Sequence, residues 1–217
     1  MSLSKVIEVA RGELGQTEDP AGSNLTKYGF WYGVNGVPWC VIFIAWVFEQ
    51  SGERMAFFGG GKTASCSILL RWYREQGLTV DKLNVQAGDI VILNFSGTVE
   101  PQHCGLVTHV ERSGGSILYI RTIEGNTVRG SDSSQDNGGM VCEKVRYPRQ
   151  VVGVCRPQYQ PEPEVVVPDY KGRWSEEYWE KGIALGIVKE SKDGKYRPTD
   201  AATREEVLAM IVRAKEG

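Results

Sequence analysis

One cysteine, directly ahead of an apolar helix, is the residue of this sequence best placed to act as a nucleophile. In "NGVPWCVIFIAWVFEQSG" (35–52), Cys40 precedes eight unbroken apolar residues. At the first turn of a helix, unpaired backbone N–H groups and the helix dipole favour a thiolate over a thiol. A buried thiol that only fills space in the core is the alternative. The choice depends on whether the sequence also offers a base.

A base for this thiol must come from one of two histidines. His103 and His109 both lie in "QHCGLVTHV", which places them on one face of a strand but about 20 Å apart at roughly 3.3 Å per residue. They therefore cannot serve one site. His103 starts the strand, before Gly105, where a side chain can overhang a cleft. We predict His103 as the base and interpret His109, beside Glu111, as a surface histidine.

The imidazole of such a base needs a partner that fixes its orientation. The next strand ends in "TIEGNT", which places Glu124 and Asn126 on one face beside the preceding strand. Either side chain can accept the ring N–H of His103, which would stabilise an imidazolium next to a Cys40 thiolate. A simple turn is the competing interpretation of this segment. With Cys40, the constellation is that of a cysteine hydrolase.

The elements that must carry these side chains follow the order of an α+β fold. Helices are indicated at "MSLSKVIEVARGELG", from Cys40 to Gly52, and at "SCSILLRWYREQG". From residue 85 the pattern changes to short β-branched runs separated by turn residues: "AGDIVILNF", "HCGLVTHVE", "SILYIRTIEGN", "GGMVCEKVRY" and "VVGVCRP". We expect helices packed on one side of a mostly antiparallel sheet.

Prolines mark a domain boundary. Four of the nine prolines fall in "PQYQPEPEVVVP", which is typical of a stiff, extended connector. We predict a main domain at 1–156, a proline-rich linker at 157–168 and a small all-α module at 169–217.

The small module shows two helical patterns that flank the turn "KDGKYRP". Thr203 is predicted to cap the second helix, with Glu206 as its capping-box partner. Apolar residues at helical spacing predict a helix–loop–helix core made of Trp174, Tyr178, Ile183, Leu185, Ile187, Val207, Leu208, Ile211 and Val212.

Bulk composition argues against several classes of function. A net charge of -2 without clustered Lys and Arg argues against a nucleic-acid partner. The longest apolar run, 41–48, is far short of the ~20 residues that span a bilayer. The N-terminus is amphipathic rather than a signal peptide, so we expect synthesis in a cytoplasm. The five cysteines form no CxxC pair, so we expect reduced thiols and no metal site.

In combination, "GSNLTKYGFWYGVNGVPWCVIFIAWVF", "AGDIVILNF", "HCGLVTHVE" and "TIEGNT" resemble the CHAP domain, the cysteine, histidine-dependent amidohydrolase/peptidase family, over roughly residues 1–156. The resemblance implies a papain-like fold. It also implies Cys40 as nucleophile, His103 as general base and then acid, Glu124 as orienting carboxylate and Asn126 as a fourth polar member. The family cleaves amide bonds of bacterial peptidoglycan, either next to the glycan's lactyl group or within the stem peptide or cross-bridge. The sequence leaves this choice open.

Some members of the family carry a calcium site in the loop before the nucleophile. Here that loop reads "GQTEDPAGSN", with adjacent rather than alternating acidic residues, so we predict no cofactor and treat calcium as the less favoured alternative. An aromatic cluster near Cys40 could line a saccharide or peptide groove, or pack in the core. It comprises Phe30, Tyr32 and our three candidate substrate-binding residues, Tyr28, Trp31 and Trp39.

The C-terminal module resembles a single S-layer homology repeat, through Trp174, "ALGIV", "DGKYRP" and "TREE". In that family the arginine of the last stretch, here Arg204, helps to bind secondary cell-wall polymer. Glu190 stands where the pattern prefers glycine, and there is one repeat where the binding unit usually assembles from three. Three alternatives stay open: the chain forms a homo-oligomer through the module, the module binds weakly, or it only packs.

The leading hypothesis is therefore a modular peptidoglycan hydrolase. A phage or prophage endolysin fits best, because such an enzyme is made in the host cytoplasm without a signal peptide and acts at the cell wall. A non-catalytic wall-binding protein with a structural Cys40 is one alternative. An intracellular cysteine protease is another.

Overall fold

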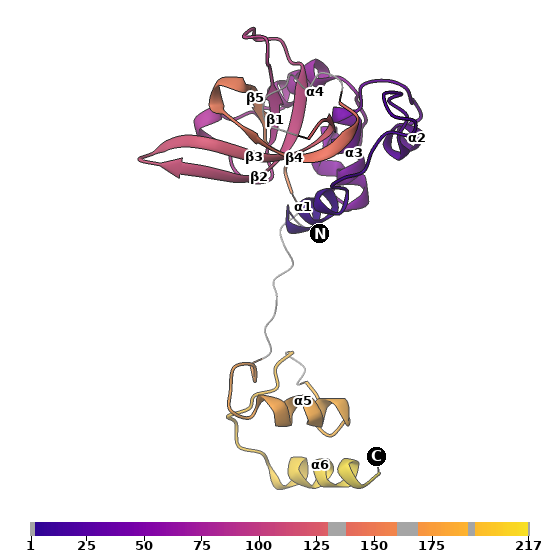
Figure 1. The fold of residues 1–217 in the computed structure, drawn as a ribbon. Helices are drawn as coiled ribbons and strands as arrows, with labels where there is room; N and C mark the ends of the chain where they lie inside the picture. Colours follow the sequence, from indigo (N-terminus) through magenta and orange to yellow (C-terminus); the bar gives the residue numbers. More distant parts are fainter. Residues whose placement is uncertain (1–2, 130–137, 160–168, 191–193, 217) are drawn as a thin grey trace. The chain divides into compact units, whose positions relative to one another are not determined.

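The computed structural model describes residues 3–129, 138–159, 169–190 and 194–216. The chain divides into two units, Met1–Pro163 and Glu164–Gly217, each of which is described by itself (Figure 1). Most of the predicted linker, 157–168, lies outside the described residues.

The first unit places four helices before five strands. The helices are α1 (Leu3–Gly12), α2 (Lys27–Tyr32), α3 (Cys40–Gln50) and α4 (Cys66–Glu75). The strands are β1 (Ile90–Leu93), β2 (His103–Ser113), β3 (Ser116–Thr127), β4 (Met140–Arg146) and β5 (Val151–Cys155). Short 3₁₀ turns lie at Arg54–Ala56, Phe58–Gly60, Lys82–Asn84 and Pro148–Gln150. The order confirms the predicted α+β class.

The strands form one antiparallel sheet in the order β4-β3-β2-β1-β5. Strand β2 is irregular: Val107 pairs with Thr122, but the next paired residue, His109, is opposite Arg121. The extra residue shifts the side-chain alternation, so that Val107 and Val110 pack into the same apolar cluster. The prediction that the two histidines share a face is therefore wrong, because it assumed a regular strand.

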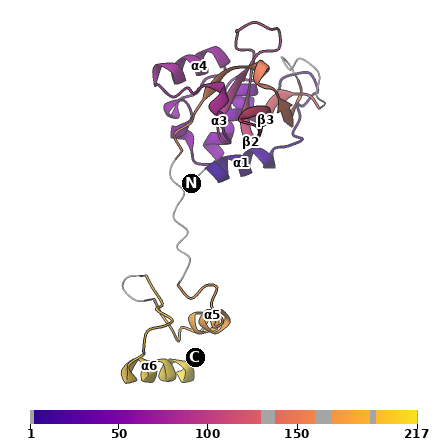
Figure 2. The same cartoon turned by 90° about the vertical axis from the view of Figure 1, so that its left-hand side faces the viewer.

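The helices cover one face of the sheet. Helix α3 contacts β2 and β3 as well as α1 and α2, and Figure 2 shows it in the middle of the unit between α1 and α4. Burial on all sides explains why its sequence is apolar all round rather than amphipathic. The opposite face carries a smaller apolar cluster, consisting of Val85, Val91, Leu93, Val107, Ile117, Ile120, Val151 and Val154.

The second unit contains α5 (Glu176–Ala184) and α6 (Arg204–Glu216). The predicted capping box is confirmed: the Thr203 N–H donates to Glu206 Oε2 at 2.7 Å, and the Glu206 N–H donates to Thr203 Oγ1 at 3.2 Å.

None of the helices in the described part of the chain has the length and apolar character needed to cross a membrane.

The predicted core of this unit is wrong for seven of its nine residues, and the other two, Ile183 and Ile187, are only half-buried. Trp174 is 90% exposed and Tyr178 is 67% exposed, and Leu185, Val207, Leu208, Ile211 and Val212 are exposed as well. The unit instead gathers the rings of Tyr170, Trp179 and Tyr196 around a half-buried centre, with ring centroids 5.1 to 6.1 Å apart. Two short helices enclose too little volume to bury both apolar faces.

Candidate active site

Cys40 is the first residue of α3, as the sequence predicts. Trp39 stands at the N-cap position and makes no side-chain cap hydrogen bond. The N–H groups of the first helical turn have no acceptor within the helix, and they create positive potential beside the thiol. The residue is only 5% exposed.

His103 and Glu124 are hydrogen-bonded to each other. His103 is the first residue of β2, and its Nε2 lies 3.0 Å from Glu124 Oε2 on β3. Both side chains are fully buried. Gly105 makes room for this pair, because a Cβ there would lie 2.8 Å from Glu124 Cγ. Of the two acceptors that the sequence offered, Glu124 is the one that meets the imidazole.

Arg146 and Thr122 complete the surroundings of Glu124, and sequence reasoning missed both. Arg146, on β4, donates from Nε to Glu124 Oε1 at 2.8 Å and from Nη2 to Oε2, and Thr122 donates from Oγ1 to Oε1. The buried guanidinium also lies 4.8 Å from the ring of Phe95. The sequence did contain a signal for Arg146. It is an arginine in "GGMVCEKVRY", the run predicted as the next strand after the one that carries Glu124.

Neighbouring side chains shift the pKa values of Cys40, His103 and Glu124. Hydrogen bonds from Cys104 and Cys66, together with the charge of His103, hold the pKa of Cys40 well below its ordinary value, although burial opposes ionisation. Burial alone would lower the pKa of His103, but Cys40 and Glu124 raise it to about 9. Burial would raise the pKa of Glu124, yet Arg146 and His103 lower it to about 2.

The second ring nitrogen of His103, Nδ1, is not the one that bonds to Glu124. Nδ1 is buried and has no hydrogen-bond partner among the residues that the structure describes. Since Nε2 is engaged by Glu124, Nδ1 is the nitrogen left for proton exchange with the Cys40 thiol. The row Arg146, Glu124, His103, Cys40 is therefore arranged to hold an imidazolium next to a thiolate.

Asn126 lies two residues beyond Glu124, with φ of 56°, in the left-handed region. It is fully buried, and neither of its amide atoms has a hydrogen-bond partner among the described residues. A buried amide without a partner is costly, which fits a group reserved for a substrate. Its role in the site stays a prediction.

Two further thiols lie at Cys40. Its Sγ is 3.9 Å from that of Cys66, and the sulfurs of Cys40, Cys66 and Cys104 all lie within 4.8 Å of one another. Cys66 starts α4 and Cys104 is the second residue of β2. Spacing along the sequence could not reveal this cluster, because three separate elements bring it together.

The predicted substrate-binding aromatic residues occupy different positions. Trp39 and Tyr28 are each 1% exposed and stack with ring centroids 5.4 Å apart. Trp31 is half-buried and lies 4.0 Å from the Lys62 ammonium. In this structure Trp39 and Tyr28 pack in the core, which was the alternative interpretation, and the binding role of all three stays a prediction.

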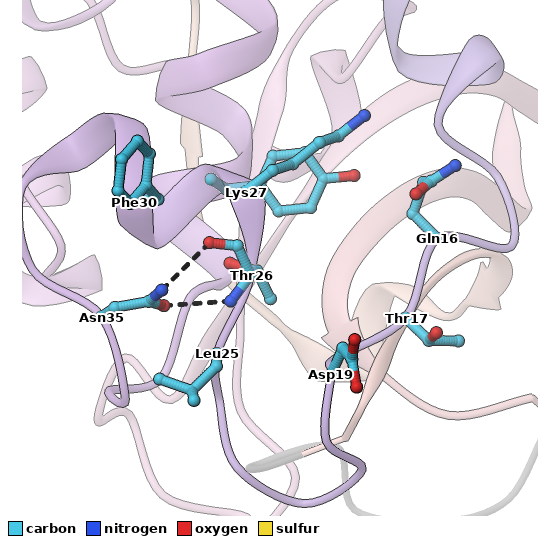
Figure 3. Close-up of a pocket in the computed structure, with 9 residues that line it drawn as sticks. Gln16, Thr17, Asp19, Leu25, Thr26, Lys27, Phe30 and Asn35 are labelled. Atoms are coloured by element: carbon cyan, nitrogen blue, oxygen red, sulfur yellow. Dashed lines mark hydrogen bonds between the residues drawn. The ribbon is translucent and has the colours of Figure 1, made fainter.

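A surface pocket of about 410 Å³ lies beside this core (Figure 3). The hydrogen bonds between Asn35 and the Thr26 backbone, 3.0 and 3.2 Å long, hold its wall together. The pocket is not at Cys40. Glu18, between the lining residues Thr17 and Asp19 in the sequence, is not itself part of the lining, and its Oε1 accepts a 2.9 Å hydrogen bond from the indole of Trp39. The remaining lining residues are Gln16, Thr17, Asp19, Leu25, Lys27, Tyr28 and Phe30.

That the loop at 15–24 holds no calcium stays a prediction. Oε1 of Glu18 accepts the indole N–H of Trp39, and the buried Oδ1 of Asn24 has no hydrogen-bond partner among the described residues. Calcium takes six to eight oxygen ligands. In the described part of the chain, the convergent set of metal-ligating side chains is the three cysteines, not a carboxylate cluster.

Comparison with known proteins finds one family that matches part of the chain. A family model described as the CHAP domain matches residues 31–126, a range that contains Cys40, His103, Glu124 and Asn126. No curated protein matches the chain. CHAP domains are cysteine- and histidine-dependent amidohydrolases or peptidases, which implies a hydrolase of the peptidoglycan amidase or peptidase type. A CHAP domain is thus found at residues 31–126, a range that holds every member of the candidate active site except Arg146.

Proposed function

We propose that this chain cleaves an amide bond of bacterial peptidoglycan with Cys40 as the nucleophile. The observation that supports this most strongly is the buried row from Arg146 through Glu124 to His103, which ends in an unpartnered Nδ1. A structural thiol would not need an oriented and charged imidazole beside it.

In the first half of the reaction, the Cys40 thiolate attacks the carbonyl carbon of the scissile amide. The backbone N–H of Cys40, at the start of α3, is suited to stabilise the oxyanion that forms. His103 then gives its Nδ1 proton to the leaving amine nitrogen as the C–N bond breaks. A thioester between Cys40 and the acyl part of the substrate remains.

In the second half, water hydrolyses the thioester. Neutral His103 takes a proton from the attacking water through Nδ1, and the C–S bond breaks to release a carboxylic acid. Glu124 stays ionised throughout, because Arg146 and His103 lower its pKa to about 2. Its role is to orient the ring and stabilise the imidazolium.

We assign the action of the enzyme to the bacterial cell wall, in the setting of a phage or prophage endolysin. The pocket beside the core supports a peptide substrate, because the Asp19 carboxylate lines it next to the exposed ring of Phe30, while Lys27 in the same wall pairs with Glu13 at 2.6 Å. A stem peptide carries carboxylates and amines that such a surface can pair. The C-terminal unit, as an S-layer homology-like module, would hold the enzyme on wall polymer.

One observation favours a second candidate. Cys40 is 5% exposed, and a thiol closed in the core is inert. In a wall-binding protein without catalysis, Cys40 would be structural and the pocket would only hold peptide. An intracellular cysteine protease would share the same site but would cleave casein and leave walls intact.

The test is turbidity loss of purified Gram-positive cell walls, followed by identification of the new amino termini. We expect Cys40→Ala and His103→Ala to lose activity by on the order of a thousandfold or more. His109→Ala is the matched control, since this histidine is exposed and its hydrogen bond within the described residues is to Glu111, at 3.1 Å. It should lyse walls like the wild type.

New L-alanine termini would identify an amidase, and termini inside the peptide an endopeptidase. Wall lysis by Cys40→Ala at the wild-type rate would reject the catalytic proposal. Loss of activity in His109→Ala but not in His103→Ala would move the base to the other histidine.

A further inference from the structure

The thiol cluster at the start of α3 has the spacing of a metal site. A tetrahedral zinc ion holds sulfur ligands at about 2.3 Å, so two such ligands are about 3.8 Å apart. The Cys40 and Cys66 sulfurs are 3.9 Å apart without any ion between them. All three sulfurs lie within 4.8 Å of one another, so Cys104 needs to move by about 1 Å at most to reach ligand spacing.

His103 is the candidate for a fourth ligand, although it stands outside the group of side chains whose ligand atoms lie within 4.8 Å of one another. Its Nδ1 is buried and unpartnered among the described residues, while Nε2 is hydrogen-bonded to Glu124. A metal-ligating histidine characteristically donates its other ring N–H to a carboxylate, which fixes the tautomer. His103 is the first residue of β2, and the neighbouring Cys40 thiol raises the pKa of its imidazole.

We propose that Cys40, Cys66 and Cys104 bind one Zn²⁺ ion, and that the imidazole of His103 moves toward the three sulfurs to supply Nδ1 as the fourth ligand. Three cysteines and one histidine form a ligand set of closed, four-coordinate zinc sites. The ligands come from α3, α4 and β2, and the Glu124 carboxylate supplies the outer partner of the imidazole.

Zinc at this site turns the hydrolase off. This consequence rests on the proposed function, because the ion would occupy the nucleophile and the base together. A closed site also leaves no open position at which zinc could activate water. The CHAP domain would therefore exist in two forms, a metal-free active form and a zinc-bound silent form, and a chelator would convert the second into the first.

The experiment measures binding separately from activity. The full chain, reduced and stripped of metal, is titrated with Zn²⁺ in competition with a chromogenic chelator, and with Co²⁺ as a spectroscopic substitute. Cys66→Ala removes one ligand, and Cys155→Ala is the matched control, since Cys155 is also a buried free thiol but stands outside the cluster.

We expect one Zn²⁺ per chain in the wild type and in Cys155→Ala, with the absorption bands of tetrahedral Co²⁺ bound to thiolates. Zinc affinity should fall by more than about a hundredfold in Cys66→Ala, because even loss of an outer partner costs 10- to 100-fold. Wall lysis by the wild type should fall in proportion to zinc occupancy. Cys66→Ala should resist zinc, measured against its own metal-free rate.

A second readout needs no variant. In the wild type, zinc should slow alkylation of Cys40, Cys66 and Cys104, mapped by peptide mass spectrometry, and leave that of Cys142 unchanged. Absence of stoichiometric binding, equal affinity in Cys66→Ala, or protection of Cys142 alone would overturn the site. Stoichiometric binding and the expected protection without any loss of wall lysis would confirm the site and instead overturn Cys40 as the nucleophile.

Discussion

Cys40 and His103 carry opposite charges in the state that the structure stabilises. The pKa of Cys40 is lowered and that of His103 is raised to about 9, so the thiolate and imidazolium coexist over a broad range up to that pH. Activity requires both charged forms. It should therefore fall on the acid side as Cys40 is protonated, and on the alkaline side as His103 loses its proton near pH 9.

Glu124→Gln should move the alkaline limb. Without the carboxylate charge, one cause of the raised pKa of His103 is gone, while burial still lowers it. We expect the alkaline limb of kcat/KM to move from about 9 toward lower pH, and kcat to fall by about 10² to 10⁴. The measurement is the pH profile of metal-free enzyme on soluble peptidoglycan fragments.

Glu143→Gln is the control for this profile. Glu143 lies on β4, is half-exposed and pairs only loosely with Arg121, at 3.8 Å. Its profile should coincide with that of the wild type. An alkaline limb that stays near pH 9 in Glu124→Gln would show that Glu124 does not set the charge of His103.

At the scale of elements, β3 and β4 form the support of the site. Arg146 on β4 is 1% exposed and bonds to Glu124 through two nitrogens. Arg146→Met would leave the Glu124 carboxylate buried without this partner, which typically costs about 3–5 kcal/mol in the free energy of unfolding. Denaturant unfolding monitored by tryptophan fluorescence measures it.

Arg121→Met provides the comparison on the neighbouring strand. The Arg121 side chain is 44% exposed and its ion pair is a surface one, so the free energy of unfolding should change by less than about 1 kcal/mol. Equal losses in the two variants would contradict the structural role given to Arg146.

Gly125 sets the distance between β3 and α3. A Cβ at Gly125 would lie 2.6 Å from Phe43 Cβ and 2.7 Å from Trp39 Cζ3, so Gly125→Ala must push α3 away from the sheet. We expect a loss of about 1–3 kcal/mol in the free energy of unfolding. Because α3 carries Cys40, kcat should fall as well.

Gly12→Ala controls for the added methyl group. Nothing lies within 4 Å of a Cβ at Gly12 in α1, so stability and kcat should stay at wild-type values or rise slightly. Wild-type kcat in a destabilised Gly125→Ala would separate the packing of α3 from the alignment of Cys40.

Part of the fold and of the site was predictable from the sequence. Hydrophobic period, turn residues and the apolar run after Cys40 predicted three of the four helices of the first unit, its five strands and the pairing of His103 with the Glu124 strand, but not the short helix α2. The bulge in β2, the thiol cluster and the guanidinium of Arg146 were not predictable, because each depends on which residues meet across strands or between elements. Local patterns carry no such information.

At the scale of the whole molecule, the second unit buries few apolar side chains, and the role proposed for it is binding to the cell wall. Arg204 is exposed at the first residue of α6. If this unit holds the enzyme on wall polymer, Arg204→Ala should weaken co-sedimentation with cell walls by about tenfold, the size of one good charged contact. Turnover of soluble fragments should not change.

Arg213→Ala provides the control in the same helix, because Arg213 is used internally and donates to the carbonyl of Ile187 at 3.2 Å. Equal wall binding by the wild type and Arg204→Ala would remove the assigned role of this arginine. Wall binding lost equally in both variants would indicate a general effect of charge on this unit.

The most direct measurement of the central claim is the rate at which iodoacetamide alkylates Cys40 of the metal-free protein between pH 5 and 10, with peptide mapping of the product. If Cys40 is a thiolate paired with His103, alkylation proceeds near neutral pH and abolishes wall lysis in step, and His103→Ala shifts the rate profile to higher pH. A Cys40 that stays unlabelled at neutral pH while walls are lysed, or one that is labelled without loss of lysis, would contradict the account.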